Sequence, residues 1–358
     1  MARLLTPRVL RRGFELSLLI SVIAFGAILL YGNDLDAFLG SLRRIEWGWV
    51  LLGMIVASLD WIGGGLRLWI TARVIHPNPP IGGMIMAGGM SAWAGYITPV
   101  QSGNGPMLIY TMKRYGVPVP VAITAALMTF IATIVFFAIV GPLAISLGAG
   151  RSLGAHGNVL GLSLYDLFLG SLGAFAGVGL LLLTIIAFPR VIRDLLVRLT
   201  ERIGRRRPRM VARLAVFQAG LDRAHQSVVA FNCRQGWAAV AWATLLTAVS
   251  HANKLLAGYI TLRALGITVD FMDVLLLQTL IMFLLYFAPT PGGAGLAELL
   301  SAAVMAIYVP RELTPLYILI WRLIQIYFTV VAGSLIFSQW VRKGLKGIEQ
   351  EATLVSTT

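Results

Sequence analysis

Residues 271–308 read FMDVLLLQTLIMFLLYFAPTPGGAGLAELLSAAVMAIY. This stretch is long and apolar, but a Pro/Gly-rich turn breaks it near its middle, and no charged residue lies at the break to hold it in water. A helix does not continue through such a turn, because proline lacks an amide donor and glycine readily leaves the helical conformation. Non-helical backbone inside a membrane needs protein or a wet cavity around its polar groups. The stretch therefore predicts a re-entrant helical hairpin.

An earlier stretch, residues 81–112, has the same organisation. Its turn at 98–106 reads TPVQSGNGP and the later turn at 288–296 reads APTPGGAGL. Both contain Pro-x3-Gly-x-Gly, and an offset of 190 residues aligns Pro99, Gly103 and Gly105 with Pro289, Gly293 and Gly295. Paired broken helices in two halves of a membrane chain indicate a transporter site near the midplane. Two alternatives stay open, namely glycines that only allow close helix packing and a pair of kinked ordinary spans.

The composition of the whole chain favours the membrane interpretation. Hydrophobic residues make up 58% and charged residues 12%, and the mean hydropathy is +0.83. This balance excludes a disordered chain, a coiled coil and a nucleic-acid-binding module. We predict an all-α polytopic membrane protein with about six full transmembrane helices and two re-entrant helical hairpins. The six crossings are expected at 14–31, 47–71, 121–140, 167–188, 237–262 and 313–337.

The distribution of lysine and arginine predicts the orientation of these spans. Twenty-one of the 29 basic residues fall in segments that are cytoplasmic if the N-terminus lies inside, five fall in outer segments and three within spans. Such a bias predicts that both termini lie on the cytoplasmic side of the plasma membrane. The charges that flank the two hairpins then make them enter from opposite faces, as an inverted repeat.

Four segments follow from this topology. Residues 1–188 form a first membrane half with a re-entrant loop at 97–106, and residues 236–341 form a second half with a re-entrant loop at 288–298. Between them, residues 189–235 carry eleven basic residues and form a cytoplasmic amphipathic linker. This linker is expected to lie on anionic lipid and not to bind nucleic acid. Residues 342–358 form a cytoplasmic tail.

Ionisable residues within spans are costly and are therefore candidates for a site. Asp60 and Arg67 lie seven residues apart, which places them on one helical face. Asp60 could equally serve as the structural counter-ion of Arg322 or Lys254, and Arg67 could reach the interface. His251 and Lys254 also share a face, and such a pair suits a phosphate group.

The residues around the two turns complete the candidate substrate-binding set. Amides at the N-termini of half-helices favour an anion such as phosphate. Glu298 follows the second turn, where it would cap the half-helix, carry protons, or both. The turn residues in the set are Pro99, Gly103, Gly105, Pro291, Gly292, Gly293 and Gly295.

The run from Ala288 to Glu298 resembles the signature of the lysylphosphatidylglycerol synthase transmembrane, or flippase-like, family. The run from Ile97 to Pro106 is similar to the first loop of that family, and Arg322 and Gly333 also match. Two places depart from the pattern: Gly103-Asn104-Gly105 lacks an acidic residue, and Thr129-Phe130 stands where a Glu-Arg pair is common. Full-length synthases add a soluble aminoacyl-transfer domain. We expect none here, since only residues 338–358 follow the last predicted span.

The resemblance implies a lipid translocator that moves a phospholipid or a lipid-linked anionic head group between leaflets. The alternatives are a membrane enzyme or assembly factor that acts on lipid-linked substrates, and a secondary transporter of small solutes. The sequence shows no zinc-protease, nucleophile-elbow or P-loop motif, so we expect no enzyme activity, no catalytic residue, no metal site and no cofactor. The expected partners are the lipid substrate and anionic lipid at the cytoplasmic surface, and self-association to a homo-oligomer stays open.

Overall fold

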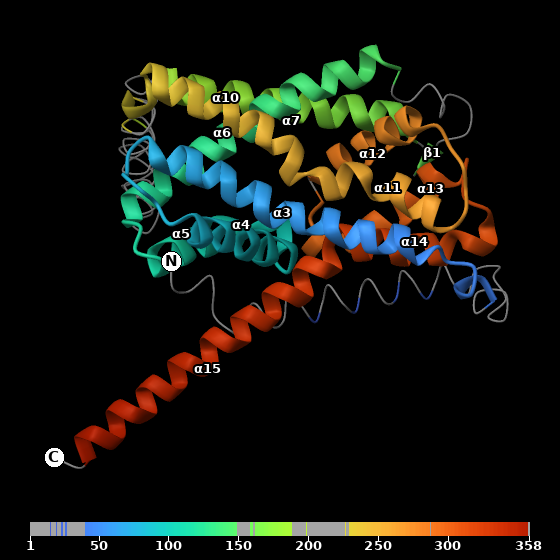
Figure 1. Ribbon diagram of the computed structural model, residues 1–358. Coiled ribbons are helices and arrows are strands. Elements are labelled where there is room, and N and C mark those ends of the chain that lie inside the picture. The colour runs from blue at the N-terminus through green and yellow to red at the C-terminus, as the bar shows by residue number, and fades with distance from the viewer. Residues whose placement is uncertain are drawn as a thin grey trace. The chain divides into compact units, whose positions relative to one another are not determined.

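The computed structural model describes residues 40–148, 158–159, 162–187, 229–286 and 288–356, together with a few isolated positions (Figure 1). The predicted span at 14–31 and most of the linker at 189–235 lie outside the described residues. The elements, in chain order, are α3 (Trp47–Arg73), α4 (Ile81–Tyr96), η1 (Pro99–Gln101), α5 (Asn104–Arg114), α6 (Val119–Ser146), β1 (Asn158–Val159), β2 (Leu162–Ser163), α7 (Leu164–Ala187), α10 (Arg234–Ser250), α11 (Ala252–Ala264), α12 (Phe271–Tyr286), η3 (Pro291–Gly293), α13 (Leu296–Met305), η4 (Arg311–Leu313), α14 (Thr314–Arg322), the π-helical turn η5 (Leu323–Tyr327) and α15 (Phe328–Ser356).

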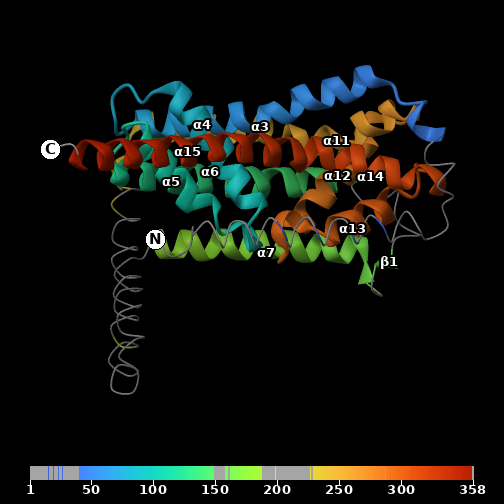
Figure 2. The same cartoon turned by 90° about the horizontal axis from the view of Figure 1, so that it is seen from below.

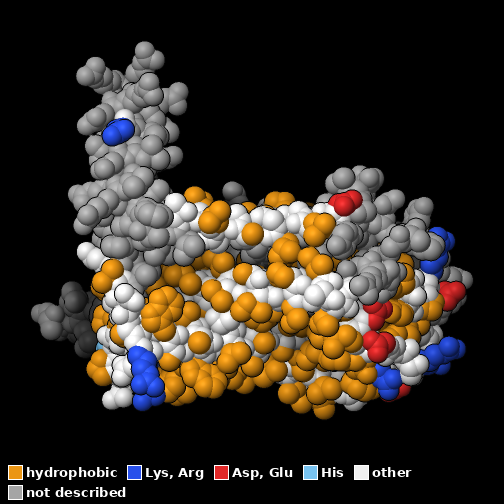
Figure 3. Space-filling view, turned by 90° about the horizontal axis from the view of Figure 1, so that it is seen from above, with side chains coloured by type: hydrophobic (Ala, Val, Ile, Leu, Met, Phe, Trp, Pro, Cys, Tyr) orange, Lys and Arg blue, Asp and Glu red, His pale blue; other side chains and the backbone are white. Residues whose placement is uncertain are grey.

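The predicted all-α membrane fold is confirmed. Strands β1 and β2 hold two residues each and pair only with one another. Within the described residues, three helical segments are long and apolar enough to cross a membrane, namely Trp47–Arg73, Val119–Ser146 and Arg311–Arg342. Hydrophobic side chains cover much of the described surface that Figure 3 shows, and charged side chains are few among them. The chain is therefore a multi-pass membrane protein, while the number and orientation of its crossings stay predictions.

Both broken stretches are interrupted where the sequence predicts. The first divides into α4, η1 and α5, and the second into α12, η3 and α13. The fifth predicted span, at 237–262, contains two helices in the structure. The first, α10, ends at Ser250, and the second, α11, starts at Ala252. The Ser250 hydroxyl donates to the Thr247 carbonyl at 3.1 Å, and such back-bonding loosens a helix.

The described chain is organised in two compact units, each built from segments far apart in sequence. Unit 1 contains Met1–Ile62, Gly88–Met107 and His251–Thr358, and unit 2 contains Gly63–Ala87 and Leu108–Ser250. The sequential halves predicted above follow the expected membrane crossings and stay a prediction.

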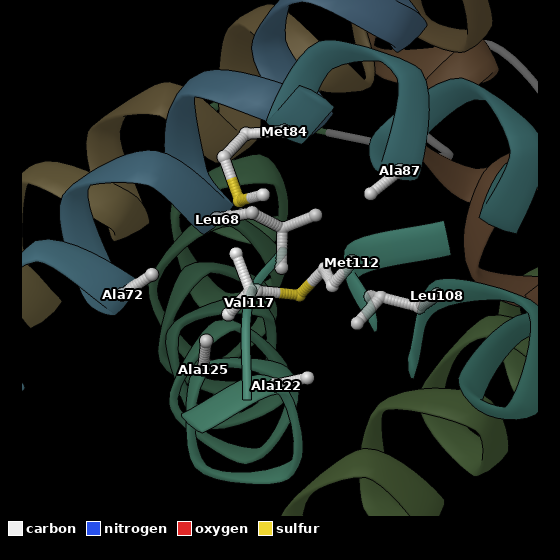
Figure 4. Close-up of a cluster of buried hydrophobic side chains, with 9 residues drawn as sticks. All are labelled: Leu68, Ala72, Met84, Ala87, Leu108, Met112, Val117, Ala122 and Ala125. Carbon is white, nitrogen blue, oxygen red and sulfur yellow. The ribbon is translucent and has the colours of Figure 1, made fainter. Parts of the chain in front are cut away.

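The core of unit 2 is made of apolar side chains from its helices, and Figure 4 shows how they converge. Small residues let the helices approach closely. A Cβ atom added to Gly65 would lie 2.2 Å from the Ile85 Cα, so no larger residue fits there. The buried cluster contains Leu68, Ala72, Met84, Ala87, Leu108, Met112, Val117, Ala122 and Ala125.

Unit 1 gathers α11, α12, α13 and α14 (Figure 2). α11 packs against α12 and α14, and α13 packs against both α12 and α14. A polar contact lies at the centre of this group, where the buried Trp321 indole donates to the Gln278 Oε1 at 2.9 Å. α15 is held by Gly333, whose Cβ position lies 2.3 Å from the Trp93 ring. This packing fixes the elements that carry both turns.

Candidate functional site

The two Pro/Gly-rich turns meet in unit 1, where η1 contacts η3. The turns lie far apart in the chain but each interrupts an apolar stretch at its middle. Their contact places two pieces of non-helical backbone together among apolar helices. In a membrane such backbone is found where protein or a wet cavity satisfies it.

The structure corrects the register of the repeat. The first helices of the two stretches, α4 and α12, begin 190 residues apart, as the sequence offset predicts. From the turns onward the offset is 192, because Pro99 of η1 matches Pro291 of η3 and Asn104 of α5 matches Leu296 of α13. The predicted match of Pro99 to Pro289 is therefore wrong. Two additional residues precede the second turn.

The backbone of the two turns follows the same path at this new offset. Val100 and Gln101 both have φ 52°, and the equivalent Gly292 and Gly293 have φ 58° and 69°. Glycine adopts this left-handed conformation without cost, whereas a β-branched residue is strained in it. Val100 is also 64% exposed, so the first turn carries strain that no burial of its side chain offsets.

The amides of two turn glycines are bonded within the turns themselves. The Gly103 amide donates to the Thr98 Oγ1 at 2.8 Å, and the Gly295 amide donates to the Glu298 Oε2 at 2.8 Å. Local side chains thus satisfy these two amides, and an anion-binding role for the other amides at the half-helix N-termini stays a prediction. Glu298 has the predicted capping role.

The glycines of the first turn differ in the space around them. A Cβ atom on Gly103 would lie 2.7 Å from the Ala94 carbonyl oxygen and 2.9 Å from the Thr98 Oγ1. Gly105 has nothing within 4 Å of its Cβ position. Close packing thus requires glycine at position 103 and not at position 105.

Arg322 fastens the second turn. Its Nε lies 2.8 Å from the Glu298 Oε1, and the two side chains are 2% and 1% exposed. The Nη1 also donates to the Gly292 carbonyl at 2.9 Å. Since Glu298 caps Gly295 with its other oxygen, one carboxylate and one guanidinium hold the whole turn. The pair is a fixed part of the structure, and a head-group role for Arg322 stays a prediction.

A second ion pair in unit 1 joins Asp60 of α3 to Lys254 of α11. The Lys254 Nζ lies 3.8 Å from the Asp60 Oδ2, and the side chains are 19% and 9% exposed. The same carboxylate oxygen accepts a hydrogen bond of 2.6 Å from the Tyr96 hydroxyl. The Lys254 Nζ also lies 5.5 Å from the centroid of the Tyr96 ring. The sequence left Arg322 and Lys254 open as counter-ions of Asp60, and in the structure the counter-ion is Lys254.

Arg67 belongs to unit 2, where its partners include neutral oxygens. Its Nη1 donates to the Ser250 Oγ at 3.0 Å, and its Nη2 donates to the Thr129 carbonyl at 2.7 Å and to the Thr133 hydroxyl. Arg67 is 8% exposed, so it lies inside the unit and does not reach outward to an interface.

Residues 14–333 match the lysylphosphatidylglycerol synthase TM region. The chain belongs to this family. No curated protein matches the chain. The match includes both turns and Arg322, so the elements that build the site lie within the family region. Together with the apolar helices, it makes the chain a membrane protein of the lysylphosphatidylglycerol synthase type.

In this member of the lysylphosphatidylglycerol synthase TM family, two site residues escaped the sequence-based set. Tyr96 binds Asp60, but a tyrosine in an apolar helix carries no signal of its own. Asn253 is fully buried, and its Nδ2 donates to the Gln325 carbonyl of η5 at 3.0 Å. Asn253 lies in a polar patch of the sequence with His251 and Lys254, and this patch is the signal that could have identified it. His251 itself is buried and stands at the break before α11.

Metal ligation requires several donor side chains that point to one place. Among the described residues, no group of three or more His, Cys, Asp or Glu is placed to hold a metal ion.

Proposed function

We propose that this protein moves a lipid with an anionic head group from one membrane leaflet to the other. The observation that carries the proposal is the contact between η1 and η3. Two broken helices whose turns meet inside an apolar unit resemble the discontinuous helices of secondary transporters, where substrates bind near the midplane. The membrane family to which the chain belongs supports a lipid as the substrate.

The charges of unit 1 favour an anionic head group. Arg322 is held at hydrogen-bonding distance by Glu298 and closes the second turn. Lys254 is less tightly held, at 3.8 Å from Asp60, and is partly exposed. A phosphate group near Lys254 would be attracted strongly, since charges interact strongly where water is scarce. Lys254 is therefore the basic residue of unit 1 that we assign to the head group.

Transport is preferred to catalysis because of how the buried carboxylates are used. Glu298 binds Arg322 and caps Gly295, while Asp60 binds Tyr96 and Lys254. General acid and base catalysis needs such groups within reach of a reacting atom. Here each carboxylate neutralises a neighbouring cation, which suits a binding site that opens and closes.

The basic residues of the chain support a proposal for the membrane in which it lies. We propose the plasma membrane, with the basic residues between Arg190 and Arg234 facing anionic lipid on the cytoplasmic side. A juxtamembrane basic segment gains about 1 kcal/mol for each basic residue near an anionic surface. The affinity of the protein for vesicles that contain anionic lipid should then fall as the salt concentration rises.

The test is a leaflet-resolved assay in proteoliposomes that contain the purified protein. Fluorescent phosphatidylglycerol is placed in both leaflets, and a membrane-impermeant reductant bleaches the outer leaflet. Translocation brings inner-leaflet lipid outward, so we expect bleaching to proceed past the plateau of protein-free vesicles. Fluorescent lysylphosphatidylglycerol and phosphatidylcholine identify the preferred head group. A folded protein that leaves the plateau unchanged for all three lipids would overturn the proposal.

A turn variant provides the matched control for this assay. Gly293 has φ 69°, which a β-branched residue accepts poorly. Gly293→Val should therefore stop translocation while the protein still inserts and purifies as a monodisperse species. Translocation at the wild-type rate by a folded Gly293→Val protein would argue that the turns only pack.

A further inference from the structure

The two ion pairs of unit 1 are built differently. Arg322 and Glu298 are in contact at 2.8 Å, are almost fully buried, and each makes a further bond to the second turn. Lys254 and Asp60 stand 3.8 Å apart, beyond the range of a good hydrogen bond, and Lys254 is 19% exposed. The first pair is fixed, whereas the second can separate without breaking a hydrogen bond between its members.

Separation of the second pair would leave the Asp60 charge in an apolar unit. Its one strong hydrogen bond in the described structure comes from the Tyr96 hydroxyl, at 2.6 Å. A buried carboxylate that loses its cation is strongly destabilised, and such a group takes up a proton instead.

Asn253 supplies what a protonated Asp60 would need. Its Oδ1 is buried and has no hydrogen-bond partner in the part of the chain that the structure describes, and Asn253 lies near Tyr96. A protonated Asp60 donates to the Tyr96 oxygen, and the Tyr96 hydroxyl then needs a new acceptor. The Asn253 Oδ1, which needs a donor, would then serve as that acceptor.

Resting on the function proposed above, we infer that Lys254 and Asp60 form an exchangeable pair that couples head-group binding to protonation. The phosphate of the head group takes Lys254 as its counter-ion, and Asp60 binds one proton from water. The net charge of the site does not change, because one anionic head group and one proton enter together. Release of the head group returns Lys254 to Asp60 and expels the proton.

Further titratable groups lie on the elements that carry Asp60 and its partners. α4 contributes Tyr96 and α11 contributes Lys254, with His251 one turn before it. α12 contributes Tyr286, which lies beside Tyr96. Arg67 follows Asp60 by two turns in α3 itself. Asp60 is the carboxylate of this group and directly faces Lys254, so it is the group that exchanges its cation for a proton.

The direct test measures protons released or taken up when lipid binds. Short-chain phosphatidylglycerol is added to detergent-solubilised wild-type protein in weakly buffered solution near pH 7, and the pH change is recorded. We expect uptake of about one proton for each head group bound. Short-chain phosphatidylcholine, whose choline neutralises its own phosphate, should give less than a tenth of this uptake. Binding of phosphatidylglycerol without proton uptake would overturn the inference.

Two variants locate the proton. Asp60→Asn mimics the protonated state, so it should bind phosphatidylglycerol but take up no proton. Asp273→Asn is the matched control, since Asp273 is a carboxylate of the same unit at the first turn of α12. It should take up protons as the wild type does. If Asp60→Asn takes up a full proton, or if Asp273→Asn takes up none, Asp60 is not the carrier.

Vesicle measurements separate this inference from the proposed function. Wild-type proteoliposomes should translocate phosphatidylglycerol at least several-fold faster when a pH gradient drives protons in the direction of lipid movement. Asp60→Asn should lose that acceleration. A wild-type translocation rate that does not depend on the pH gradient would refute the proton coupling but not the proposed lipid translocation. Absence of wild-type translocation under every gradient would instead refute the translocase.

Discussion

Thr98 and Thr290 occupy equivalent positions in the two turns, 192 residues apart, yet their hydroxyls have different partners. The Thr98 Oγ1 donates to the Ala94 carbonyl at 2.6 Å and accepts from the Gly103 amide at 2.8 Å. The Thr290 Oγ1 is buried without a hydrogen-bond partner in the described structure. In the second turn Glu298 caps the half-helix instead. The repeat thus keeps its backbone path but changes the residue that stabilises it.

This difference predicts opposite outcomes for one substitution at two matched sites. Thr98→Val should lower stability by about 1–2 kcal/mol, because the Gly103 amide loses its acceptor inside the protein. Thr290→Val should be neutral or stabilising, since it removes a buried hydroxyl without a partner. Thermal unfolding of the two variants in detergent measures the effect. A larger loss for Thr290→Val than for Thr98→Val would contradict this account.

A second prediction concerns the space around the glycines of the first turn. Gly103→Ala should cost about 1–3 kcal/mol, because the new Cβ would lie 2.7 Å from the Ala94 carbonyl oxygen. Gly105→Ala should change the free energy of unfolding by less than about 0.5 kcal/mol, since its Cβ position is open. The readout is again the unfolding temperature. Equal temperatures for the two variants would show that the first turn relaxes around the added methyl group.

Much of the fold follows from the sequence because the strongest signals are physical ones. Pro and Gly in the middle of two apolar stretches predict the breaks that separate α4 from α5 and α12 from α13. Ionisable residues in apolar helices point to Asp60, Lys254, Glu298 and Arg322, and the structure joins these four into two ion pairs.

The parts that sequence missed depend on geometry that no local pattern carries. The Pro-x3-Gly-x-Gly motif aligns Pro99 with Pro289, whereas the backbone path aligns it with Pro291, and only that path shows the shift of two residues. The helix break at His251 lacks a proline or glycine, so apolar periodicity runs through it. The link of Tyr96 to Asp60 is a contact across 36 positions. Each of these is decided by packing and not by propensity.

A third prediction tests the opposed entry of the two broken stretches, which rests on their flanking charges. Single cysteines replace Lys113, just before the end of α5, and Thr268, just before α12, in a Cys233→Ser background. Both positions are exposed. Because both flanks should remain on the side at which their stretch enters, a membrane-impermeant thiol reagent should label Lys113→Cys from the cytoplasmic side and Thr268→Cys from the outside. Labelling of both from one side would exclude the inverted repeat.

The last prediction concerns the pair that fastens the second turn. Arg322→Ala leaves the Glu298 carboxylate buried without its cation and removes the donor to the Gly292 carbonyl, so it should cost about 3–5 kcal/mol. Arg322→Lys keeps the charge but not the planar fork that reaches both acceptors, and it should recover only part of the loss.

Two further variants show whether the loss comes from the pair itself. Arg322→Met combined with Glu298→Gln removes both charges and keeps a side chain that can cap Gly295. It should lose less stability than the two single changes added together, because neither partner is left charged and buried. Arg263→Ala is the matched control, since that guanidinium lies over the Trp49 ring at 5.3 Å and is not part of either pair. Its unfolding temperature should fall less than that of Arg322→Ala. Additive effects in the double variant would mean that Arg322 and Glu298 stabilise the turn independently and that the second turn is not held by their contact.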